Sequence, residues 1–368
     1  MFTARLTRLL QEMTARGVAA VAVNAGPTLT YLTGLHFHLM ERPVVMVFSS
    51  SCPPIIILPE LEQAKLTGLS YPVRSFVYGE NPDGWGAVFC QALQELSGAK
   101  GLKIGTEPRQ LRLLEYGLLQ GALAAEYIDG TALFAALRSI KDASEIATMQ
   151  QAVKIAEDAL TATLPALRLG ISEKEIASEL FMQLMRHGCD PALPFAPIVA
   201  SGPNGANPHA QPSARCLAGG DLLIIDWGAC YGGYVSDLTR TFAVGSVGEE
   251  EQLIHSLVAA ANAAGRAAGR PGLPCAAVDH ATRKVIEDGG YGRQFTHRTG
   301  HGLGMECHED PYIRGDNDQL LAVGMTYTVE PGIYLTGRNG VRIEDDVVVT
   351  ENGALSLSTM SRDLRVIC

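Results

Sequence analysis

The sequence predicts an α+β protein of two domains, and three observations lead to this fold class. With 368 residues, the chain is too long for one ordinary hydrophobic core. Up to about residue 135, short apolar segments alternate with helical ones, as in a small α/β domain. Further on, strands and helices come in runs, which is typical of helices packed against an antiparallel sheet. We place the boundary between residues 137 and 138, shortly before a long helix.

The N-terminal domain, residues 1–137, is expected to contain a sheet covered by helices. Apolar runs typical of buried strands occupy residues 18–24, 44–50, 55–58 and 102–105. Helical spacing of apolar residues predicts helices over residues 6–16, 85–96 and 111–124.

The C-terminal domain, residues 138–368, is expected to begin with a helix over residues 143–164 that ends at Pro165. Ser172 and Glu175 form a capping box, which predicts a second helix reaching about His187. Two more helices are predicted over residues 249–268 and 276–288. Predicted strands cover residues 197–201, 222–228, 233–244, 325–335 and 341–350.

Composition excludes several classes of function. The net charge is −10 and no cluster of Lys and Arg stands out, so we expect neither nucleic acid nor an anionic membrane as partner. No apolar run reaches the roughly 20 residues that a membrane helix needs. Eight cysteines are scattered without CxxC pairs, which predicts reduced thiols in a cytoplasmic protein.

An acidic pair stands out in the first predicted hairpin of the C-terminal domain. Asp226 ends an apolar strand, and Asp237 follows a turn rich in glycine and tyrosine. If the hairpin is centred on Tyr231 and Gly232, the two aspartates face each other with Cβ atoms about 5 Å apart.

A second hairpin repeats this arrangement with glutamates. Centred on Gly337, it places Glu330 opposite Glu344. Facing like charges destabilise a sheet unless a cation compensates them. The alternative is a pair of solvated acidic faces, or one carboxylate held protonated. Both acidic pairs follow strongly apolar runs, where an unpaired charge is costly, and this favours a metal site.

A histidine-rich segment supplies the remaining ligand candidate. His297, His301 and His308 lie within twelve residues, and glycines flank His301, so its imidazole can approach a metal closely. Four carboxylates compensate two divalent cations, and the mixed oxygen and nitrogen set suits Mn²⁺, Co²⁺ or Zn²⁺. A lone histidine is more often structural, but three so close together favour a metal centre.

At these segments the chain resembles the "pita-bread" metallopeptidases, and within them the Xaa-Pro dipeptidases (prolidases) and aminopeptidases P. The matching segments occur in the family's order at residues 225–228, 236–240, 299–304, 308–309, 330–334 and 340–345. The resemblance covers the C-terminal domain and implies the curved antiparallel sheet of the pita-bread fold. The N-terminal domain resembles the family's creatinase-like α/β domain in length and rhythm.

The resemblance implies which residues hold the two divalent ions, with Mn²⁺ expected first and Co²⁺ or Zn²⁺ as alternatives. Asp226 would chelate one ion, and Asp237 and Glu344 would bridge both. His301 and Glu330 would complete the second, with Glu330 also placed to move protons.

The resemblance also implies residues that act on the substrate. His308 would stabilise the developing oxyanion or hydrogen-bond the scissile carbonyl. His209 matches a family histidine that lines the proline side, and its alternative is an ordinary surface-loop histidine. His297 and Arg342 are further substrate-side candidates. Arg342 has the alternative of pairing with a nearby carboxylate such as Asp345.

The implied reaction is hydrolysis of an Xaa-Pro bond by a hydroxide that bridges the two ions. Because proline has no N–H, the site must be shaped for its ring, and Phe195 is either a wall for that ring or ordinary core. We expect small peptides with proline in second position as substrates, and the family implies a homodimer.

The sequence leaves dipeptidase and aminopeptidase P activity open. A dipeptide's terminal carboxylate needs a cation nearby, and some prolidases carry one directly after a His-Glu-x-Pro segment, where this chain has Tyr312. We favour Arg42, in an aromatic-rich loop, as that cation, which makes an Xaa-Pro dipeptidase our first expectation. The alternative for Arg42 is a salt bridge with Glu41 or a subunit contact. A metal-stabilised binding module without turnover is a third reading, disfavoured because every ligand position and His308 are filled.

Overall fold

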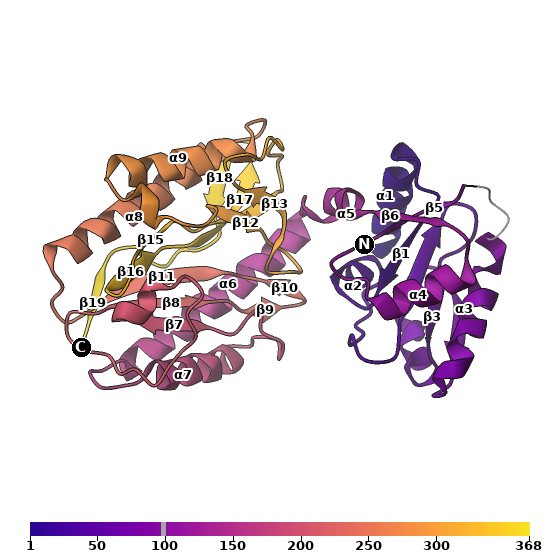
Figure 1. Ribbon diagram of the computed structural model, residues 1–368, viewed down its shortest axis with the longest axis horizontal. Coiled ribbons are helices and arrows are strands. Elements are labelled where there is room, and N and C mark those ends of the chain that lie inside the picture. The colour runs from indigo at the N-terminus through magenta and orange to yellow at the C-terminus, as the bar shows by residue number, and fades with distance from the viewer. Residues whose placement is uncertain (97–100) are drawn as a thin grey trace. The chain divides into compact units, whose positions relative to one another are not determined.

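The computed structural model describes residues 1–96 and 101–368, which form two compact units, Met1–Arg138 and Ser139–Cys368. Each unit has its own sheets and its own apolar core (Figure 1). Within the described ranges, no helix has the length and apolar character required to cross a bilayer.

The N-terminal unit is built on a mixed six-stranded sheet with strand order β4-β3-β2-β1-β5-β6. Its strands are β1 Ala20–Asn24, β2 Val45–Ser49, β3 Ile55–Pro59, β4 Arg74–Tyr78, β5 Lys103–Thr106 and β6 Glu126–Asp129. Its helices are α1 Phe2–Ala15, α2 Pro27–Thr33, α3 Trp85–Leu93, α4 Leu113–Ala122 and α5 Thr131–Arg138, with 3-10 turns at η1 Glu60–Gly68, η2 Pro82–Gly84 and η3 Gln94–Leu96.

The predicted strands and helices of this unit are confirmed, with ends shifted by a few residues. The sequence analysis missed β4 and β6, which form the two edges of the sheet and are only partly buried, so no continuous apolar run marks them. It also missed the short helices α2 and α5.

The C-terminal unit contains two larger antiparallel arrangements and two small hairpins. A four-stranded sheet has the order β19-β11-β8-β7 and a five-stranded sheet the order β13-β12-β14-β17-β18, while β9 pairs with β10 and β15 with β16. Among the described residues of this unit, β11 pairs in parallel with β19, and the other strand pairs are antiparallel. The strands are β7 Ile198–Ser201, β8 Leu222–Trp227, β9 Cys230–Tyr231, β10 Tyr234–Val235, β11 Leu238–Val244, β12 Gly300–Gly302, β13 Glu309–Ile313, β14 Thr326–Val329, β15 Gly332–Leu335, β16 Asn339–Arg342, β17 Asp345–Thr350, β18 Gly353–Ser356 and β19 Arg365–Ile367.

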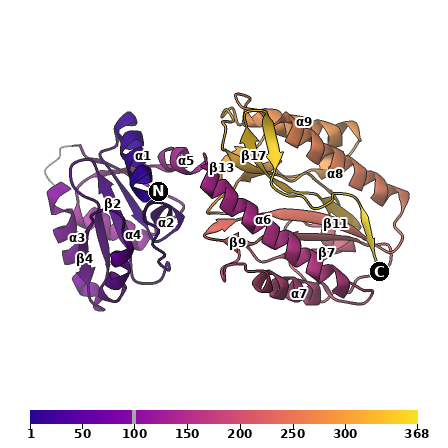
Figure 2. The same cartoon turned by 180° about the vertical axis from the view of Figure 1, so that it is seen from behind.

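Helices cover these sheets in two pairs. The helices are α6 Ala143–Thr163, α7 Glu173–Arg186, α8 Glu249–Ala268 and α9 Cys275–Asp288, with 3-10 turns at η4 Leu164–Ala166, η5 Gly202–Ala206 and η6 Gly292–Gln294. Helices α8 and α9 lie side by side (Figure 1), and so do α6 and α7 (Figure 2). The predicted capping box of Ser172 and Glu175 opens α7, and Asp142 with Glu145 forms another that opens α6.

The apolar faces of these helices bury the sheets that carry the acidic residues. Residues of α6 and α7, among them Val153 and Leu180, share one core with Ile225 of β8. Val258 of α8 shares a second core with Val341 of β16. The acidic strand ends are therefore held on a rigid, close-packed support.

Three strands predicted as continuous are interrupted in the structure. The breaks fall between β10 and β11, between β14 and β15, and between β16 and β17, at Asp237, Glu330 and Glu344. After Glu330 the reason is Pro331, which has no N–H for a ladder bond. The regular strands are therefore interrupted at three of the predicted metal ligands.

The predicted register of the first hairpin is wrong, whereas that of the second is confirmed. The turn falls at Gly232 and Gly233, which both have positive φ angles of 56° and 78°, as a two-residue turn of this type requires. Asp226 consequently pairs with Thr239 and not with Asp237. In the second hairpin, the pairs that flank Glu330 and Glu344 on both sides have the predicted register.

Candidate metal centre and substrate pocket

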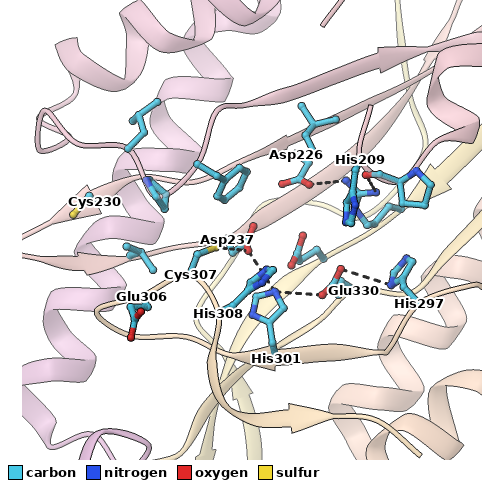
Figure 3. Close-up of a pocket in the computed structure, with 18 of the residues that line it drawn as sticks. His209, Asp226, Cys230, Asp237, His297, His301, Glu306, Cys307, His308 and Glu330 are labelled. Atoms are coloured by element: carbon cyan, nitrogen blue, oxygen red, sulfur yellow. Dashed lines mark hydrogen bonds and ion pairs between the residues drawn. The ribbon is translucent and has the colours of Figure 1, made fainter. Parts of the chain in front are cut away.

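The five residues predicted as metal ligands lie together in the C-terminal unit. Figure 3 labels four of them, Asp226, Asp237, His301 and Glu330. Asp226, Asp237 and Glu344 form one group, and His301, Glu330 and Glu344 form another. In each group the potential ligand atoms lie within 4.8 Å of one another. Glu344 belongs to both groups, so the arrangement offers two adjoining positions for cations.

Asp226 lies near the end of β8 with one of its two carboxylate oxygens engaged. Arg342 donates from Nη2 to Oδ2 of Asp226 at 2.5 Å. Oδ1 is buried and has no hydrogen-bond partner. A buried carboxylate oxygen without a partner is costly, so this atom has the environment expected of a metal ligand.

Asp237 lies in the gap between β10 and β11 and is held from two sides. Its backbone N–H donates to Oδ2 of Asp346 at 3.0 Å. The thiol of Cys307 donates to Oδ2 of Asp237 at 3.0 Å. These contacts fix the residue where it leaves the strand ladder.

Thr239 joins the two acidic hairpins. It pairs with Asp226 across the sheet and forms an isolated bridge with Glu344. Its hydroxyl donates to Oε2 of Glu344 at 2.7 Å and accepts from Nε of Arg342 at 3.2 Å. One buried threonine therefore links the strand of Asp226 to the carboxylate of Glu344.

The imidazole of His301 presents Nε2 to the acidic residues. Nδ1 lies 3.1 Å from the carbonyl of Gly302, and this contact favours the tautomer that carries its proton on Nδ1. Nε2 lies 3.3 Å from Oε1 of Glu330 and 3.7 Å from Oδ2 of Asp237. Burial lowers the pKa of His301 well below its ordinary value, so the ring is neutral and able to bind a metal.

The protonation behaviour of the carboxylates fits a site for divalent cations. Burial and then the charge of Asp237 raise the pKa of Glu344 well above its ordinary value, and burial followed by the charge of Asp226 does the same for Asp237. Burial also raises the pKa of Asp226, against the opposing charge of Arg342, and brings that of Glu330 to about 7. Four buried carboxylates that are all ionised repel one another and destabilise the fold. Cations bound between them compensate this negative charge.

His308 stands beside this cluster. It forms a third close group with Asp237 and His301, and its ring lies 3.9 Å from that of His301. Nη2 of Arg298 approaches Nδ1 of His308 at 3.4 Å. Because an arginine can only donate, Nδ1 is the accepting nitrogen, which leaves the proton of the neutral ring on Nε2.

A cavity of about 1000 Å³ opens over these residues. Besides the five ligand candidates, residues predicted to contact substrate line it: His209, Phe195, His297, His308 and Arg342. Phe195 is partly buried and shares the wall with Leu193 and Val235. His209 is exposed at the cavity, close to Asp226 in Figure 3.

Arg342, Tyr334 and His297 form a buried hydrogen-bonded chain along one side of the cavity. Arg342 donates to the hydroxyl of Tyr334 at 3.0 Å, and that hydroxyl lies 2.8 Å from Nε2 of His297. Burial and then the charge of Arg342 lower the pKa of His297 to about 4. The alternative that Arg342 pairs with a carboxylate is confirmed, but the partner is Asp226. The example named, Asp345, binds Arg240 and other arginines.

The loop that carries His209 is anchored at both ends by Glu173, the first residue of α7. Oε1 of this buried carboxylate accepts from the backbone and the hydroxyl of Ser201 at 2.7 and 2.8 Å. Oε2 accepts from the backbone and the hydroxyl of Ser213 at 2.9 and 2.7 Å, and from Asn204 at 2.8 Å. Arg342 also donates to the carbonyl of Pro208 at 3.2 Å, beside His209.

Arg42 lies in the N-terminal unit and is engaged there. It pairs with Glu80 at 2.9 Å and with Glu41 at 3.2 Å. Its role toward a substrate carboxylate stays a prediction.

The sequence analysis missed four residues that shape the site: Thr239, Tyr334, Glu173 and Arg298. Tyr334 and Thr239 lie within segments that carried the family resemblance, so their position beside the ligands was a usable signal. Glu173 was visible only as the residue after a capping serine. Arg298 had no signal beyond its place between His297 and the His301 segment.

Comparisons with known proteins agree with this geometry. Residues 147–351 match the model of metallopeptidase family M24, and residues 5–140 match that of the creatinase/prolidase N-terminal domain. The chain is 32% identical over 371 residues to a protein of Lactobacillus delbrueckii subsp. lactis named Xaa-Pro dipeptidase, covering 99% of this chain and 98% of that one.

Two solved structures have the same overall fold. A prolidase from Thermococcus sibiricus superposes with a TM-score of 0.92 at 33% identity, over 100% of this chain and 99% of that one. An X-Pro aminopeptidase from Thermotoga maritima superposes with a TM-score of 0.84 at 30% identity, over 98% of this chain and 99% of that one. The pita-bread fold and the creatinase-like domain expected from the sequence are therefore confirmed.

Proposed function

Since this chain belongs to metallopeptidase family M24, we propose that it is an Xaa-Pro dipeptidase that works with two divalent ions, Mn²⁺ foremost. The observation that carries the proposal is the buried cluster of four carboxylates and one neutral imidazole at the cavity. Residues 138–368 would form the catalytic domain and residues 1–137 the creatinase-like domain. The relatives named Xaa-Pro dipeptidase and prolidase support the substrate class.

We assign the cation ligands as predicted from the sequence. Asp226 and Asp237 would hold ions together with Glu344, and so would His301 and Glu330, since Glu344 belongs to both close groups. When bound, the ions polarise the scissile carbonyl and activate a water molecule for attack. Asp226 and Glu344 enter this role already oriented by Arg342 and Thr239.

The remaining steps fall to side chains at the cavity wall. Glu330 lines the cavity, and its carboxylate would accept a proton from the attacking water and pass it to the leaving proline nitrogen. The Nε2–H group of His308 would donate a hydrogen bond to the oxygen that gains negative charge. His209 and His297 would line the proline side of the substrate pocket, and Phe195 would contact the proline ring.

The assembly and the compartment are also proposals. We infer a homodimer from the family resemblance. The eight cysteines, all of which lie within the described residues, are free thiols, which supports an enzyme of the reducing cytoplasm.

The test uses metal-stripped protein with an Xaa-Pro dipeptide and with a tripeptide that begins Xaa-Pro, each with and without Mn²⁺ or Co²⁺. We expect metal-dependent release of proline from the dipeptide and no cleavage of the tripeptide. Cleavage of the tripeptide would identify an aminopeptidase P instead. If the protein binds metal but hydrolyses neither peptide, the peptidase proposal is contradicted. The alternative of a metal-stabilised binding module without turnover would then be favoured.

The matched control for this test is Asp237→Asn. The change keeps the shape of the side chain but removes the charge of one of the assigned ligands. The variant should lose metal binding, measured by calorimetric titration, together with hydrolysis. Full hydrolysis with Asp237→Asn would contradict the assigned centre even if the wild type cleaves dipeptides.

A further inference from the structure

One cation at the cavity wall has no acidic partner. Arg298 lines the cavity from the segment between β12 and η6. Its guanidinium carbon lies 4.7 Å from the centre of the Tyr312 ring, and Nη2 lies 3.4 Å from Nδ1 of His308. Among the described residues, no Asp or Glu forms an ion pair with it within 4.0 Å.

The other arginines considered for substrate binding are already neutralised. Arg342 also lines the cavity, but it donates to Asp226, Tyr334, Thr239 and the Pro208 carbonyl. Arg42 pairs with two glutamates in the N-terminal unit. Arg298 is therefore the cavity arginine whose charge remains available to an incoming anion.

The position of Arg298 suits one end of a short peptide. His308, which it contacts, forms a close group with the ligand candidates Asp237 and His301. In an Xaa-Pro dipeptide, the terminal carboxylate lies only one residue from the bond to be cleaved. A cation that recognises this carboxylate must therefore stand next to the ligand cluster, as Arg298 does.

We propose that Arg298 binds the C-terminal carboxylate of the dipeptide and thereby selects dipeptides over longer chains. This inference rests on the proposed function. The planar guanidinium offers two parallel N–H groups to a carboxylate, and the ring of Tyr312 beneath it limits its orientations. A longer peptide carries a neutral amide at this point, so it forms no ion pair with the guanidinium.

The test compares an Xaa-Pro dipeptide with the same compound as its C-terminal amide, which differs only in the carboxylate. In the metal-loaded wild type, kcat/KM should favour the dipeptide by about tenfold or more, as expected for hydrogen bonds to a charged group. Arg298→Met should raise KM for the dipeptide at least about tenfold while KM for the amide stays unchanged. Arg298→Lys, which keeps the charge, should recover part of the preference.

Two controls separate this role from others. Arg314→Met removes an exposed arginine that pairs with Asp316 at 2.9 Å, and both substrates should be cleaved as by the wild type. If Arg298 acted only through His308, Arg298→Met would lower kcat for both substrates equally, and the proposal would be overturned. An unchanged dipeptide preference in Arg298→Met would overturn it as well.

Failure of the proposed function gives a different result. If the metal-loaded wild type cleaves no Xaa-Pro bond, the dipeptidase proposal falls, and the carboxylate site is then tested by calorimetric binding of L-proline and L-prolinamide. Tighter binding of proline by the wild type, lost in Arg298→Met, would support the site. Equal binding of the two ligands would overturn it.

Discussion

Arg342 and Asp226 form a buried ion pair in which the arginine occupies one carboxylate oxygen and leaves the other without a partner. Nη2 lies 2.5 Å from Oδ2, while Oδ1 is buried and unbonded. The same arginine binds Thr239 and Tyr334, so its position is fixed independently of the aspartate. Arg342 thus orients Asp226 toward the other ligand candidates.

Arg342→Met is therefore expected to weaken metal binding although Arg342 is not a ligand. Loss of a group that orients a ligand typically costs about 10- to 100-fold in metal affinity. Calorimetric titration of Mn²⁺ into the metal-stripped variant measures this. Arg362→Met, which removes an arginine paired with the neighbouring Asp345, is the control and should keep affinity within about threefold of wild type. Equal affinities of Arg342→Met and wild type would contradict the orienting role.

Glu173→Gln should loosen the loop that carries His209. The glutamine side chain would point its NH2 group at N–H and O–H groups that now donate to the carboxylate, so hydrogen bonds on one side would be lost. We therefore expect a loss of about 1–3 kcal/mol in the free energy of unfolding. We also expect about a tenfold rise in KM for an Xaa-Pro dipeptide, since His209 would lose its position.

Two further variants make this prediction specific. Glu175→Gln alters the capping box on the same turn of α7 and should leave KM unchanged, because Ser172 is its one hydrogen-bond partner outside the helix among residues 1–96 and 101–368. In a His209→Ala background, Glu173→Gln should raise KM no further. Additive effects on KM would show that Glu173 acts elsewhere.

Removing one member of the buried ion pair between Lys141 and Glu309 should destabilise the fold strongly. Nζ and Oε1 lie 2.7 Å apart, and the two side chains are only 1% and 8% exposed. Lys141→Met would leave a buried carboxylate without its cation, at a cost of about 3–5 kcal/mol in urea unfolding. Lys154→Met breaks an exposed pair with Asp158 and should cost less than about 1 kcal/mol. Similar losses in both variants would be inconsistent with this account.

His255 should make the stability of the protein depend on pH. Burial lowers the pKa of this histidine to about 4, and its Nε2 has no partner. The unfolded chain has an ordinary histidine pKa of about 6.5, so between about pH 4 and 6.5 it binds more protons than the folded one. The contribution is fully present above about pH 6.5 and is lost as the pH falls, by about 3 kcal/mol in all.

The measurement compares the free energy of unfolding of wild type and His255→Leu at pH 7 and pH 5. The difference between the two proteins should shift in favour of His255→Leu at the lower pH, and other titrating groups cancel in this comparison. A difference that does not vary with pH would mean that the imidazole is not buried as the neutral form.

The clustering of the five candidate ligands could be predicted from the sequence even though the first hairpin was placed in the wrong register. The error moved the partner of Asp226 from Asp237 to Thr239, a shift of two residues. Because side chains alternate along a strand with a period of two, an even shift keeps the same face toward the cavity. Two adjacent glycines, Gly232 and Gly233, made the turn ambiguous, whereas the single Gly337 fixed the second hairpin.

Other features depend on contacts between segments that are far apart in the chain. Nothing in the local sequence shows that Glu173 will gather Ser201 and Ser213, or that Arg342 will reach Asp226 and not Asp345. The missing acidic partner of Arg298 is likewise a property of the folded surroundings. A sequence pattern identifies candidate functional residues, but it does not show which distant residues form ion pairs or hydrogen bonds with them.

The division of the ligands between two hairpins has a consequence for biosynthesis. Asp237 leaves the ribosome 93 residues before Glu330 (330 − 237), and Glu344 follows later still. During that interval the sheet of β8 and β11 carries two aspartates while Glu330 and Glu344 do not yet exist. A site that holds only these two aspartates lacks the other candidate ligands, so we expect tight metal uptake only once the C-terminal unit is complete.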